Sequence, residues 1–405
     1  MISSTFFSIF KLILLSKILG PEEFGIYTII LSLYIFIMFF GSLGLNQGSF
    51  KYASFSKGRN DSLELKNYIS LAINLGGIGI LILSVLIFLI INIINLNFLV
   101  DKFFYSIVIL AFSAFQFNIA STFLRTSQNF IFYAVIIFLK NLLIVLGIYL
   151  INYNYEISSI IVIILESLTS LFLSIFVFYI KNVYSSFFKI FFKLESIIKI
   201  LFAGFTITLS IVVRNLTLNL DKWVLGIMMG EKFVGIYAFS MIFYQFSLVI
   251  YNYFSTIFGT KWLAEYGKTN NLKEALVQLY KIVKVIIILS ILCLLFVNFF
   301  ASNFIMLYFE DYTLAVPLLP FIIIGSAASI ISYLIEQILI AISKEKSVFY
   351  ITVLNSVCVV ALILIIYFNS LGIIYFAYVF MINRLLSLFL YIYLFKKYKK
   401  NIYGF

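Results

Sequence analysis

The 405-residue sequence contains no histidine, only 3 prolines and 2 cysteines, and few charged residues. Without histidine the chain lacks the usual acid–base group of enzymes, the base of Ser–His and Cys–His catalytic pairs, and the commonest zinc ligand. Cys293 and Cys358 lie inside apolar segments without metal-ligand spacing, so we expect two core residues and no disulfide framework. We therefore expect no enzyme activity, no cofactor and no metal.

Charged residues make up 11% of the chain, against about 25% in an average soluble domain, and hydrophobic residues make up 64%, against about 45–50%. A soluble fold of this size could not enclose so much apolar surface. Aromatic residues, at 19%, suit a surface that faces lipid and its interfaces. The composition excludes a soluble globular chain and a disordered chain, and it predicts an integral membrane protein.

Twelve apolar segments are long enough to cross a membrane as helices, which takes about 20 residues each. They cover residues 1–19, 24–50, 67–95, 103–124, 130–152, 157–180, 200–229, 235–260, 277–300, 314–341, 347–368 and 371–395. The alternating pattern of a membrane β-barrel is absent. The predicted fold class is therefore an all-α integral membrane protein with twelve transmembrane helices, and the first segment lacks the features of a cleaved signal peptide.

The distribution of lysine and arginine predicts how these helices are oriented. With a cytoplasmic N-terminus, twenty of the 28 basic residues fall in inner loops or the C-terminal tail: Lys51, Lys57, Arg59, Lys66, Arg125, Lys181, Lys189, Lys193, Lys199, Lys261, Lys268, Lys273, Lys281, Lys284, Lys344, Lys346, Lys396, Lys397, Lys399 and Lys400. The outer loops carry only Lys102 and Lys232. We expect a multi-pass protein of the cell inner (cytoplasmic) membrane with both termini in the cytoplasm. Because the net charge of +12 arises from these loops, we expect no nucleic-acid partner.

No loop is long enough to fold as a catalytic domain. Within residues 184–199, Lys189 and Lys193 share one helical face and phenylalanines surround them, which predicts a short helix in the inner membrane interface. The expected organisation is an N-terminal six-helix lobe over residues 1–183, this linker helix over residues 184–199, and a C-terminal six-helix lobe over residues 200–405.

An internal repeat relates the two expected lobes. Residues 20–27 read GPEEFGIY and residues 230–237 read GEKFVGIY, so a Gly-x4-Gly-Ile-Tyr element recurs after 210 residues at the same outer turn between helices. An even number of helices in each lobe makes the repeats parallel, related by an axis along the membrane normal. Such repeats place a central cavity between the two lobes, as in many transporters.

Several motifs resemble those of bacterial polysaccharide flippases. They are LILLSKIL followed by GPEEFGIY, the helix end GSLGLNQGSFKYAS, and DKWVLGIMMGEKFVGIYAFS at the start of the second half. The resemblance covers essentially the whole chain and places it in the superfamily that also holds lipid II flippases and multidrug and toxin extrusion transporters. Lys17 stands where the family often has arginine, which keeps the charge but loses bidentate geometry. The chain also begins almost inside its first helix, where members usually have a longer lead-in.

One face of the seventh predicted helix is polar. Its residues are Thr206, Ser210, Arg214, Thr217 and Asp221, at i, i+4, i+8, i+11 and i+15. We interpret this stripe as a cavity lining, because arginine is hard to bury in a dry seam; a polar seam between packed helices is the alternative. The repeat aligns Asp221 with Lys11, which predicts that Lys11 faces the same cavity; alternatively, Lys11 extends to the inner surface.

Other polar residues lie near the middle of their predicted helices. Lys140 and Glu166 reach similar depths and could form a pair, either structural or functional. Arg384 is either a cavity cation or part of a packed seam. Asn46, Gln47 and Lys51 adjoin glycines that predict close helix packing, and the family resemblance implies a role for these three at the inner mouth.

The deep charges are mainly cationic, which suits an anionic cargo. The resemblance implies a flippase that moves an undecaprenyl-pyrophosphate-linked oligosaccharide from the inner to the outer leaflet for surface polysaccharide (O-antigen) biosynthesis. We expect alternating access of the two lobes, with the pyrophosphate held by arginine and lysine and the polyprenyl tail left in membrane lipid. The candidate substrate-binding residues are Lys11, Asn46, Gln47, Lys51, Lys140, Arg214, Thr217 and Arg384, and the candidate ion-coupling residues are Glu166 and Asp221. A polysaccharide polymerase and other assembly proteins are possible partners.

Direct use of ATP is not expected, since GKT at residues 267–269 follows Trp262 where a phosphate-binding loop requires glycine. Three other activities stay open. A lipid II flippase usually carries further helices after the twelve, whereas this sequence stops at Phe405, and a drug exporter for cations should have an acidic cavity. A membrane polysaccharide polymerase should have a long outer loop with catalytic residues, and none is present here.

Overall fold

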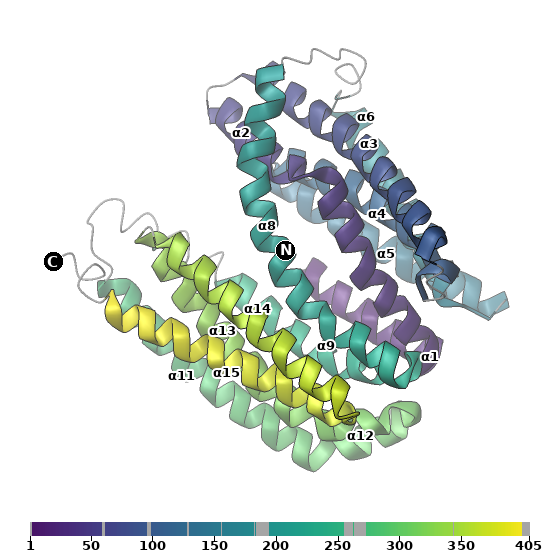
Figure 1. Ribbon diagram of the computed structural model, residues 1–405, viewed down its shortest axis with the longest axis vertical. Coiled ribbons are helices and arrows are strands. Elements are labelled where there is room, and N and C mark those ends of the chain that lie inside the picture. The colour runs from purple at the N-terminus through teal and green to yellow at the C-terminus, as the bar shows by residue number, and fades with distance from the viewer. Residues whose placement is uncertain are drawn as a thin grey trace. The chain divides into compact units, whose positions relative to one another are not determined.

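A computed structural model describes residues 2–58, 61–94, 99–127, 129–154, 156–181, 183, 194–254, 262, 273–342 and 344–398. These residues form helices, and the described part of the chain contains no strand. The α-helices are α1 (Ile2–Ser42), α2 (Leu45–Gly58), α3 (Ser62–Ile94), α4 (Leu99–Thr126), α5 (Phe130–Asn154), α6 (Ser159–Ile180), α8 (Leu194–Met229), α9 (Glu231–Phe254), α11 (Lys273–Phe296), α12 (Ser302–Tyr308), α13 (Leu319–Ala341), α14 (Glu345–Phe368) and α15 (Ile373–Lys397) (Figure 1). A π-helical turn, Val297–Ala301, precedes α12, and the 3-10 helix η3, Glu310–Leu318, follows it.

The predicted all-α membrane architecture is confirmed. Nine helices within the described residues are long and apolar enough to cross a membrane. In lipid every backbone polar group needs an internal partner, and a helix supplies it. The first of the nine, Phe7–Ser42, combines two expected spans. The expected spans 200–229 and 235–260 correspond to α8 and α9, in which some side chains lie outside the description, as do residues 255–260.

The structure corrects one expected boundary and leaves another untested. The segment 24–50 is not one helix, because Leu43 (φ 47°) and Gly44 (φ 84°) separate α1 from α2. At Gly44 an added Cβ would collide with the backbone of Gly204 in α8, so this turn needs glycine both for its positive φ and for a close helix approach. The predicted interfacial helix falls mostly on residues 184–193, outside the described residues, and α8 begins at Leu194.

The chain divides into two compact units at other positions than the expected lobe boundaries. The N-terminal unit comprises residues 26–215, and the C-terminal unit comprises residues 4–25 and 216–405. The start of α1 thus packs in the C-terminal unit, while α8 up to Asn215 packs in the N-terminal unit. Gly20, at φ 69° and ψ 174°, interrupts α1 five residues before the first of these divisions.

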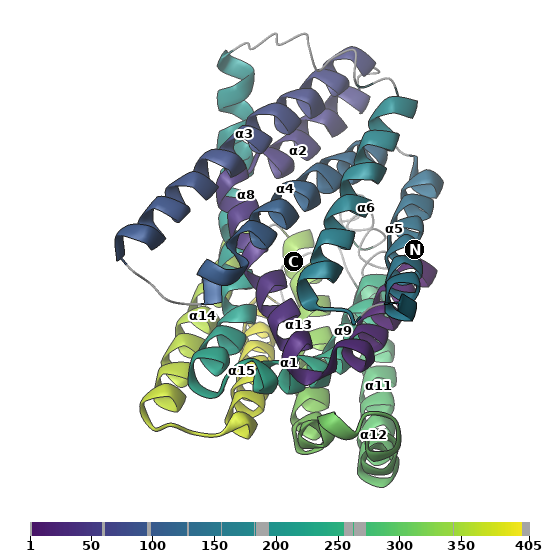
Figure 2. The same cartoon turned by 90° about the vertical axis from the view of Figure 1, so that its right-hand side faces the viewer.

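The N-terminal unit is built around α4, which contacts α2, α3, α5 and α6 (Figure 2). Phe115 of α4 is fully buried, and its ring fills the space beside Gly76 of α3. Gly41 of α1 meets Ile80 of α3 at backbone distance, so a side chain at this glycine would push the helices apart. Small residues at such crossings are typical of membrane helix packing, where no water drives association.

The C-terminal unit is centred on α13, which contacts α9, α11, α14, α15 and η3. Its side chains Ile322, Leu334, Ile338 and Leu339 are completely buried. The fully buried Tyr312 of η3 donates a hydrogen bond of 2.8 Å to the carbonyl oxygen of Ser16, which fixes the start of α1 to this unit. Such an anchor explains why the first helical segment is separated from the residues that follow it in sequence.

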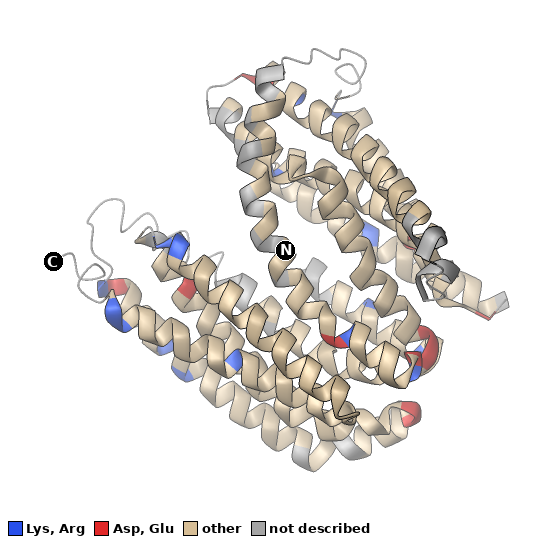
Figure 3. Ribbon diagram, viewed as in Figure 1, with Lys and Arg blue, Asp and Glu red and all other residues tan. Residues whose placement is uncertain are grey.

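Lysines end α15 at one end of the C-terminal unit, and two acidic residues begin η3. Lys396 and Lys397 end α15, and the start of α14 lies beside them, since Ser347 Oγ is 3.1 Å from Tyr398 Oη. Glu310 and Asp311 begin η3 at the other end of the unit (Figure 3).

Candidate functional site

The repeated Gly-x4-Gly-Ile-Tyr element has the same backbone role in both copies. Its first glycine adopts a left-handed conformation, with φ of 69° at Gly20 and 89° at Gly230, and each ends a helical segment. A Cβ at either glycine would meet no atom within 4 Å, so the positive φ is the constraint there, not space. The first glycine of the repeat is therefore a helix-breaking residue.

The second glycine of the repeat allows the two copies to touch each other inside the C-terminal unit. A Cβ at Gly25 would collide with the carbonyl oxygen of Glu231, and a Cβ at Gly235 would collide with the carbonyl oxygen of Pro21. The contact is reciprocal, as expected where two repeats meet near a symmetry axis. The sequence analysis did not predict the contact between the two repeats, although the second glycine of the Gly-x4-Gly-Ile-Tyr element occurs in both.

The tyrosine that closes each repeat donates a hydrogen bond to a buried carboxylate. In the N-terminal unit Tyr27 Oη lies 2.6 Å from Glu166 Oε1 of α6. In the C-terminal unit Tyr237 Oη lies 2.6 Å from Asp221 Oδ2 of α8. Both tyrosines are completely buried, and Glu166 and Asp221 are only 5% and 8% exposed. The two candidate ion-coupling residues thus have equivalent partners in separate units.

The buried carboxylate is not repeated at the offset of 210 residues that relates the two tyrosines. The position 210 residues after Glu166 is Phe376, whose ring packs edge-on against Tyr237 with centroids 6.4 Å apart. The tyrosine therefore meets the equivalent helix in each unit, while its carboxylate partner comes from α6 in one unit and from α8 in the other. The sequence identified both acids as candidates but missed the tyrosines, whose place at the end of the repeat was the available signal.

Arg384 of α15 is the most deeply placed cation for which the structure describes the side chain in the C-terminal unit. It is 8% exposed, and its Nη1 lies 3.5 Å from the hydroxyl of Tyr333 in α13. Its guanidinium carbon lies 5.4 Å from the ring centroid of Tyr244 and 5.3 Å from that of Phe380, within cation–π range. The sequence left a cavity cation and a seam open for Arg384, and the surroundings are aromatic and polar.

Two buried amide oxygens lie in the same unit without hydrogen-bond partners among the described residues. They are Oδ1 of Asn383, beside Arg384 in sequence, and Oδ1 of Asn355 in α14. The side-chain nitrogen of Asn355 donates to Ser387 Oγ at 2.7 Å, so this amide is fixed in orientation. Nearby on α14, Ser356 accepts a hydrogen bond of 2.6 Å from the predicted site residue Thr217. Buried acceptors without partners are rare and indicate a group that the protein itself does not supply.

The remaining predicted site residues are spread over both units. Lys11 is half-buried on α1 in the C-terminal unit, and Lys140 is half-buried on α5 with its ammonium 4.4 Å from the ring centroid of Phe117. Gln47 is half-buried on α2. The side chains of Lys51 and Arg214 lie outside the described residues, although both positions are helical. The Lys140–Glu166 pair stays a prediction.

Asn46 belongs to a hydrogen-bonded chain that the sequence did not predict. Its Oδ1 accepts a hydrogen bond of 3.1 Å from Thr122 Oγ1, and the same hydroxyl accepts one of 3.2 Å from Arg125 Nη2. Arg125 was assigned only to the inner loops by its charge. These hydrogen bonds from Arg125 through Thr122 to Asn46 connect α2 with the end of α4 inside the N-terminal unit.

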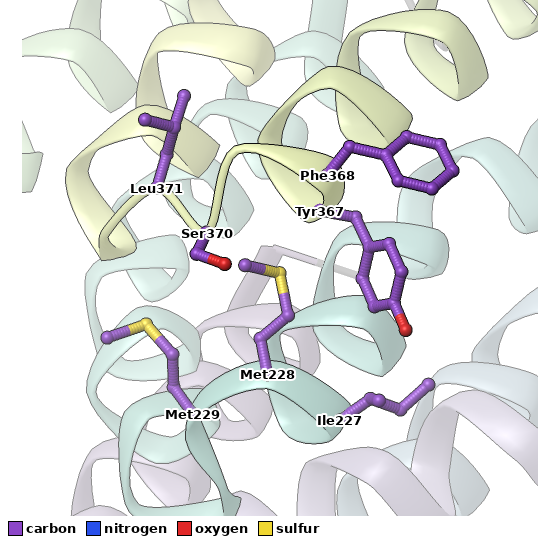
Figure 4. Close-up of a pocket in the computed structure, with 7 residues that line it drawn as sticks. All are labelled: Ile227, Met228, Met229, Tyr367, Phe368, Ser370 and Leu371. Carbon is purple, nitrogen blue, oxygen red and sulfur yellow. The ribbon is translucent and has the colours of Figure 1, made fainter.

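A pocket among the described residues of the C-terminal unit contains none of the predicted site residues. It has a volume of about 600 Å³ and is lined by Ile227, Met228, Met229, Tyr367, Phe368, Ser370 and Leu371, where the end of α8 faces the connection from α14 to α15 (Figure 4). A smaller apolar pocket of about 310 Å³ lies among α9, α11 and α13. Among the described residues no group of three or more His, Cys, Asp or Glu could hold a metal ion.

The fold is shared with solved membrane transporters. An inward-facing multidrug resistance MATE family transporter of the MOP superfamily is 14% identical, with a TM-score of 0.78 over 98% of this chain and 95% of that chain. The lipid II flippase MurJ in an inward closed conformation is 18% identical, with a TM-score of 0.73 over 98% and 88%. A MOP superfamily transporter from Pyrococcus furiosus, described as having a binding pocket of reverse polarity, is 14% identical, with a TM-score of 0.68 over 98% and 92%. No curated protein matches the sequence.

These likenesses define the class of protein, a helical membrane protein with the two-lobe fold of MOP superfamily transporters. Residues 2–263 match the family of polysaccharide biosynthesis proteins, and the chain belongs to that family. The resemblance and the fold class predicted from the sequence are thereby confirmed.

Proposed function

We propose that the protein is a flippase that moves an undecaprenyl-pyrophosphate-linked oligosaccharide repeat unit from the inner to the outer leaflet of the cytoplasmic membrane. Membership of the polysaccharide biosynthesis family and the MOP fold support transport of a lipid-linked saccharide rather than catalysis. The lipid II flippase with the same fold handles a substrate of related chemistry according to its name. The polyprenyl tail stays in membrane lipid while the headgroup crosses by alternating access.

The observation that carries the proposal is the environment of Arg384. A buried guanidinium beside the Tyr333 hydroxyl offers charge-assisted hydrogen bonds to a pyrophosphate. The amide oxygens of Asn383 and Asn355 have no partner among the described residues and can accept hydrogen bonds from sugar hydroxyls. Cation and acceptors together match a phosphate-linked sugar better than a cationic drug, which would require a buried acid in place of Arg384.

The predicted substrate-binding residues keep this role as part of the proposal. They are Lys11, Asn46, Gln47, Lys51, Lys140, Arg214, Thr217 and Arg384. Glu166 and Asp221 are proposed to couple transport to an ion. Each accepts a hydrogen bond from the tyrosine of one repeat, so the two units hold their acids in the same way. A carboxylate that can change its hydrogen-bonded partner is suited to bind and release a cation during a transport cycle.

The proposed orientation places both termini in the cytoplasm of a cell with surface polysaccharide. The basic end of the C-terminal unit, with Lys396 and Lys397, then faces inward and the acidic end with Glu310 and Asp311 faces outward. A polysaccharide polymerase and other assembly proteins are the expected partners on the outer side, since they consume the flipped unit.

The test is deletion of the gene in its native host, with the lipid-linked oligosaccharides measured by mass spectrometry and the surface polymer measured in the same cells. The proposal predicts complete repeat units accumulating on the lipid carrier together with loss of the polymer. Incomplete units would contradict the proposal and indicate an enzyme of assembly. An unchanged lipid pool with altered drug sensitivity would contradict it in favour of an exporter.

A further inference from the structure

Arg125, at the last turn of α4, is an exposed arginine whose guanidinium contacts a buried hydroxyl and two aromatic rings. Its Nη2 donates to Thr122 Oγ1 at 3.2 Å, and that hydroxyl donates onward to Asn46 Oδ1 at 3.1 Å. Thr122 is completely buried, whereas Arg125 is exposed. The side chain is therefore fastened to the interior of the N-terminal unit at one edge while the rest of it reaches the surface.

Two aromatic rings fix the guanidinium from its sides. Its central carbon lies 5.1 Å from the ring centroid of Phe50 in α2 and 5.8 Å from that of Tyr133 in α5. Both distances are within cation–π range. Because rings from two other helices and a hydroxyl of its own helix all hold it, Arg125 loses little further rotamer freedom when it binds a ligand.

Arg125 is exposed and uses few of its donors within the described part of the protein. A guanidinium has five N–H donors, and the described residues use Nη2 alone as a hydrogen-bond donor. The planar fork of the remaining donors matches two oxygens of a phosphate. An arginine that only solvates its charge at a membrane surface needs neither the hydroxyl chain nor the two rings.

Lys181, at the end of α6 in the same unit, provides a comparison. Its ammonium lies 5.4 Å from the ring centroid of Phe132, so it also contacts an aromatic ring near a helix end. No hydrogen bond connects its side chain to another described residue, in contrast to Arg125. Lys181 thus has a positive charge and one aromatic contact, as Arg125 does, but it lacks the hydrogen bonds that connect Arg125 to Asn46.

We propose that Arg125, positioned by Thr122, Phe50 and Tyr133, is a binding site for the phosphate groups of the polyprenyl-linked cargo where it enters from the inner leaflet. This inference rests on the proposed function and adds a residue to it that loop charge alone cannot distinguish from other basic residues. It gives Asn46 a defined task, since this amide holds the hydroxyl on which Arg125 rests.

The test measures binding of farnesyl pyrophosphate to the full-length protein in detergent by native mass spectrometry and titration calorimetry. We expect Arg125→Ala to weaken binding by about tenfold or more, as loss of hydrogen bonds to a charged group implies, and Lys181→Ala to leave it unchanged. Arg125→Lys should recover only part of the loss, because the fork is missing. Inorganic pyrophosphate should compete, and phosphatidylglycerol at the same concentration should not.

Equal affinity of Arg125→Ala and the wild type would overturn the proposal, as would full displacement by phosphatidylglycerol, which would assign Arg125 to bulk lipid. If Arg125→Ala does not fold, Thr122→Val keeps the side-chain volume, and it should weaken binding severalfold; unchanged binding in that variant overturns the proposal as well. The host deletion is a separate readout. Normal export in the deletion strain with Arg125-dependent binding of the probe would contradict the proposed function and leave the anion site standing.

Discussion

Replacing Tyr27 by phenylalanine tests whether the repeat tyrosines stabilise the buried carboxylates. The change removes one hydroxyl and keeps the ring, so the packing of a completely buried side chain is preserved. Its 2.6 Å hydrogen bond to Glu166 is lost. Hydrogen bonds to charged groups contribute about 1.5–3 kcal/mol, and hydrogen bonds between membrane helices average about 0.6 kcal/mol. We therefore expect Tyr27→Phe to lower the free energy of unfolding by about 1–3 kcal/mol.

The assay is a double-mutant cycle with Tyr27→Phe, Glu166→Gln and the combined variant, measured by unfolding of the purified protein in detergent. The cycle should give a coupling energy of about 0.5–3 kcal/mol, the range found for residues in one hydrogen-bonded network. Tyr149→Phe, on α5 of the same unit and 69% exposed, is the control and should show no comparable coupling to Glu166. A coupling energy near zero for the Tyr27 pair would refute the reasoning, because the two groups would then not stabilise each other.

Three further changes have definite expected outcomes. Gly235→Ala should greatly reduce accumulation of the protein in membranes on immunoblots, since its Cβ collides with backbone, whereas Gly372→Ala has open space and should accumulate normally. Arg214→Ala should abolish polysaccharide export in a complementation assay while the protein still accumulates in the membrane, and full export would remove the argument for this cation. If Lys140 and Glu166 form a structural pair, Lys140→Ala should reduce accumulation and the charge-swapped double variant should restore it; no rescue would argue against the pair.

The helices were predictable because apolar runs of sufficient length have few other structures available in a membrane. The break at Leu43 and Gly44 was not, although it lies where α1 and α2 meet the backbone of Gly204, 160 residues away in the sequence. The sequence pattern shows that Gly44 permits close packing, but not which helix approaches it. The expected continuous helix over 24–50 was wrong at these two residues.

In the candidate site too, the sequence predicted the buried charges but not the residues that contact them. Depth along a predicted helix was enough to select Glu166, Asp221 and Arg384, because charge is costly in lipid. Their partners come from other helices: Tyr27 is 139 residues from Glu166, and Tyr333 is 51 residues from Arg384. Helical periodicity assigns a face to a residue, and only the packing of the helices decides what that face meets.

The most direct test of the account is transbilayer movement of the cargo by the purified protein. Proteoliposomes would contain an undecaprenyl-pyrophosphate-linked oligosaccharide in both leaflets, and a membrane-impermeant glycosidase would be added outside. The account predicts that the enzyme reaches nearly all of the lipid in vesicles with wild-type protein, but only the outer-leaflet share in vesicles with Arg384→Ala. Cleavage limited to the outer leaflet with folded wild-type protein, under an imposed membrane potential or ion gradient as well, would contradict the assignment as a flippase.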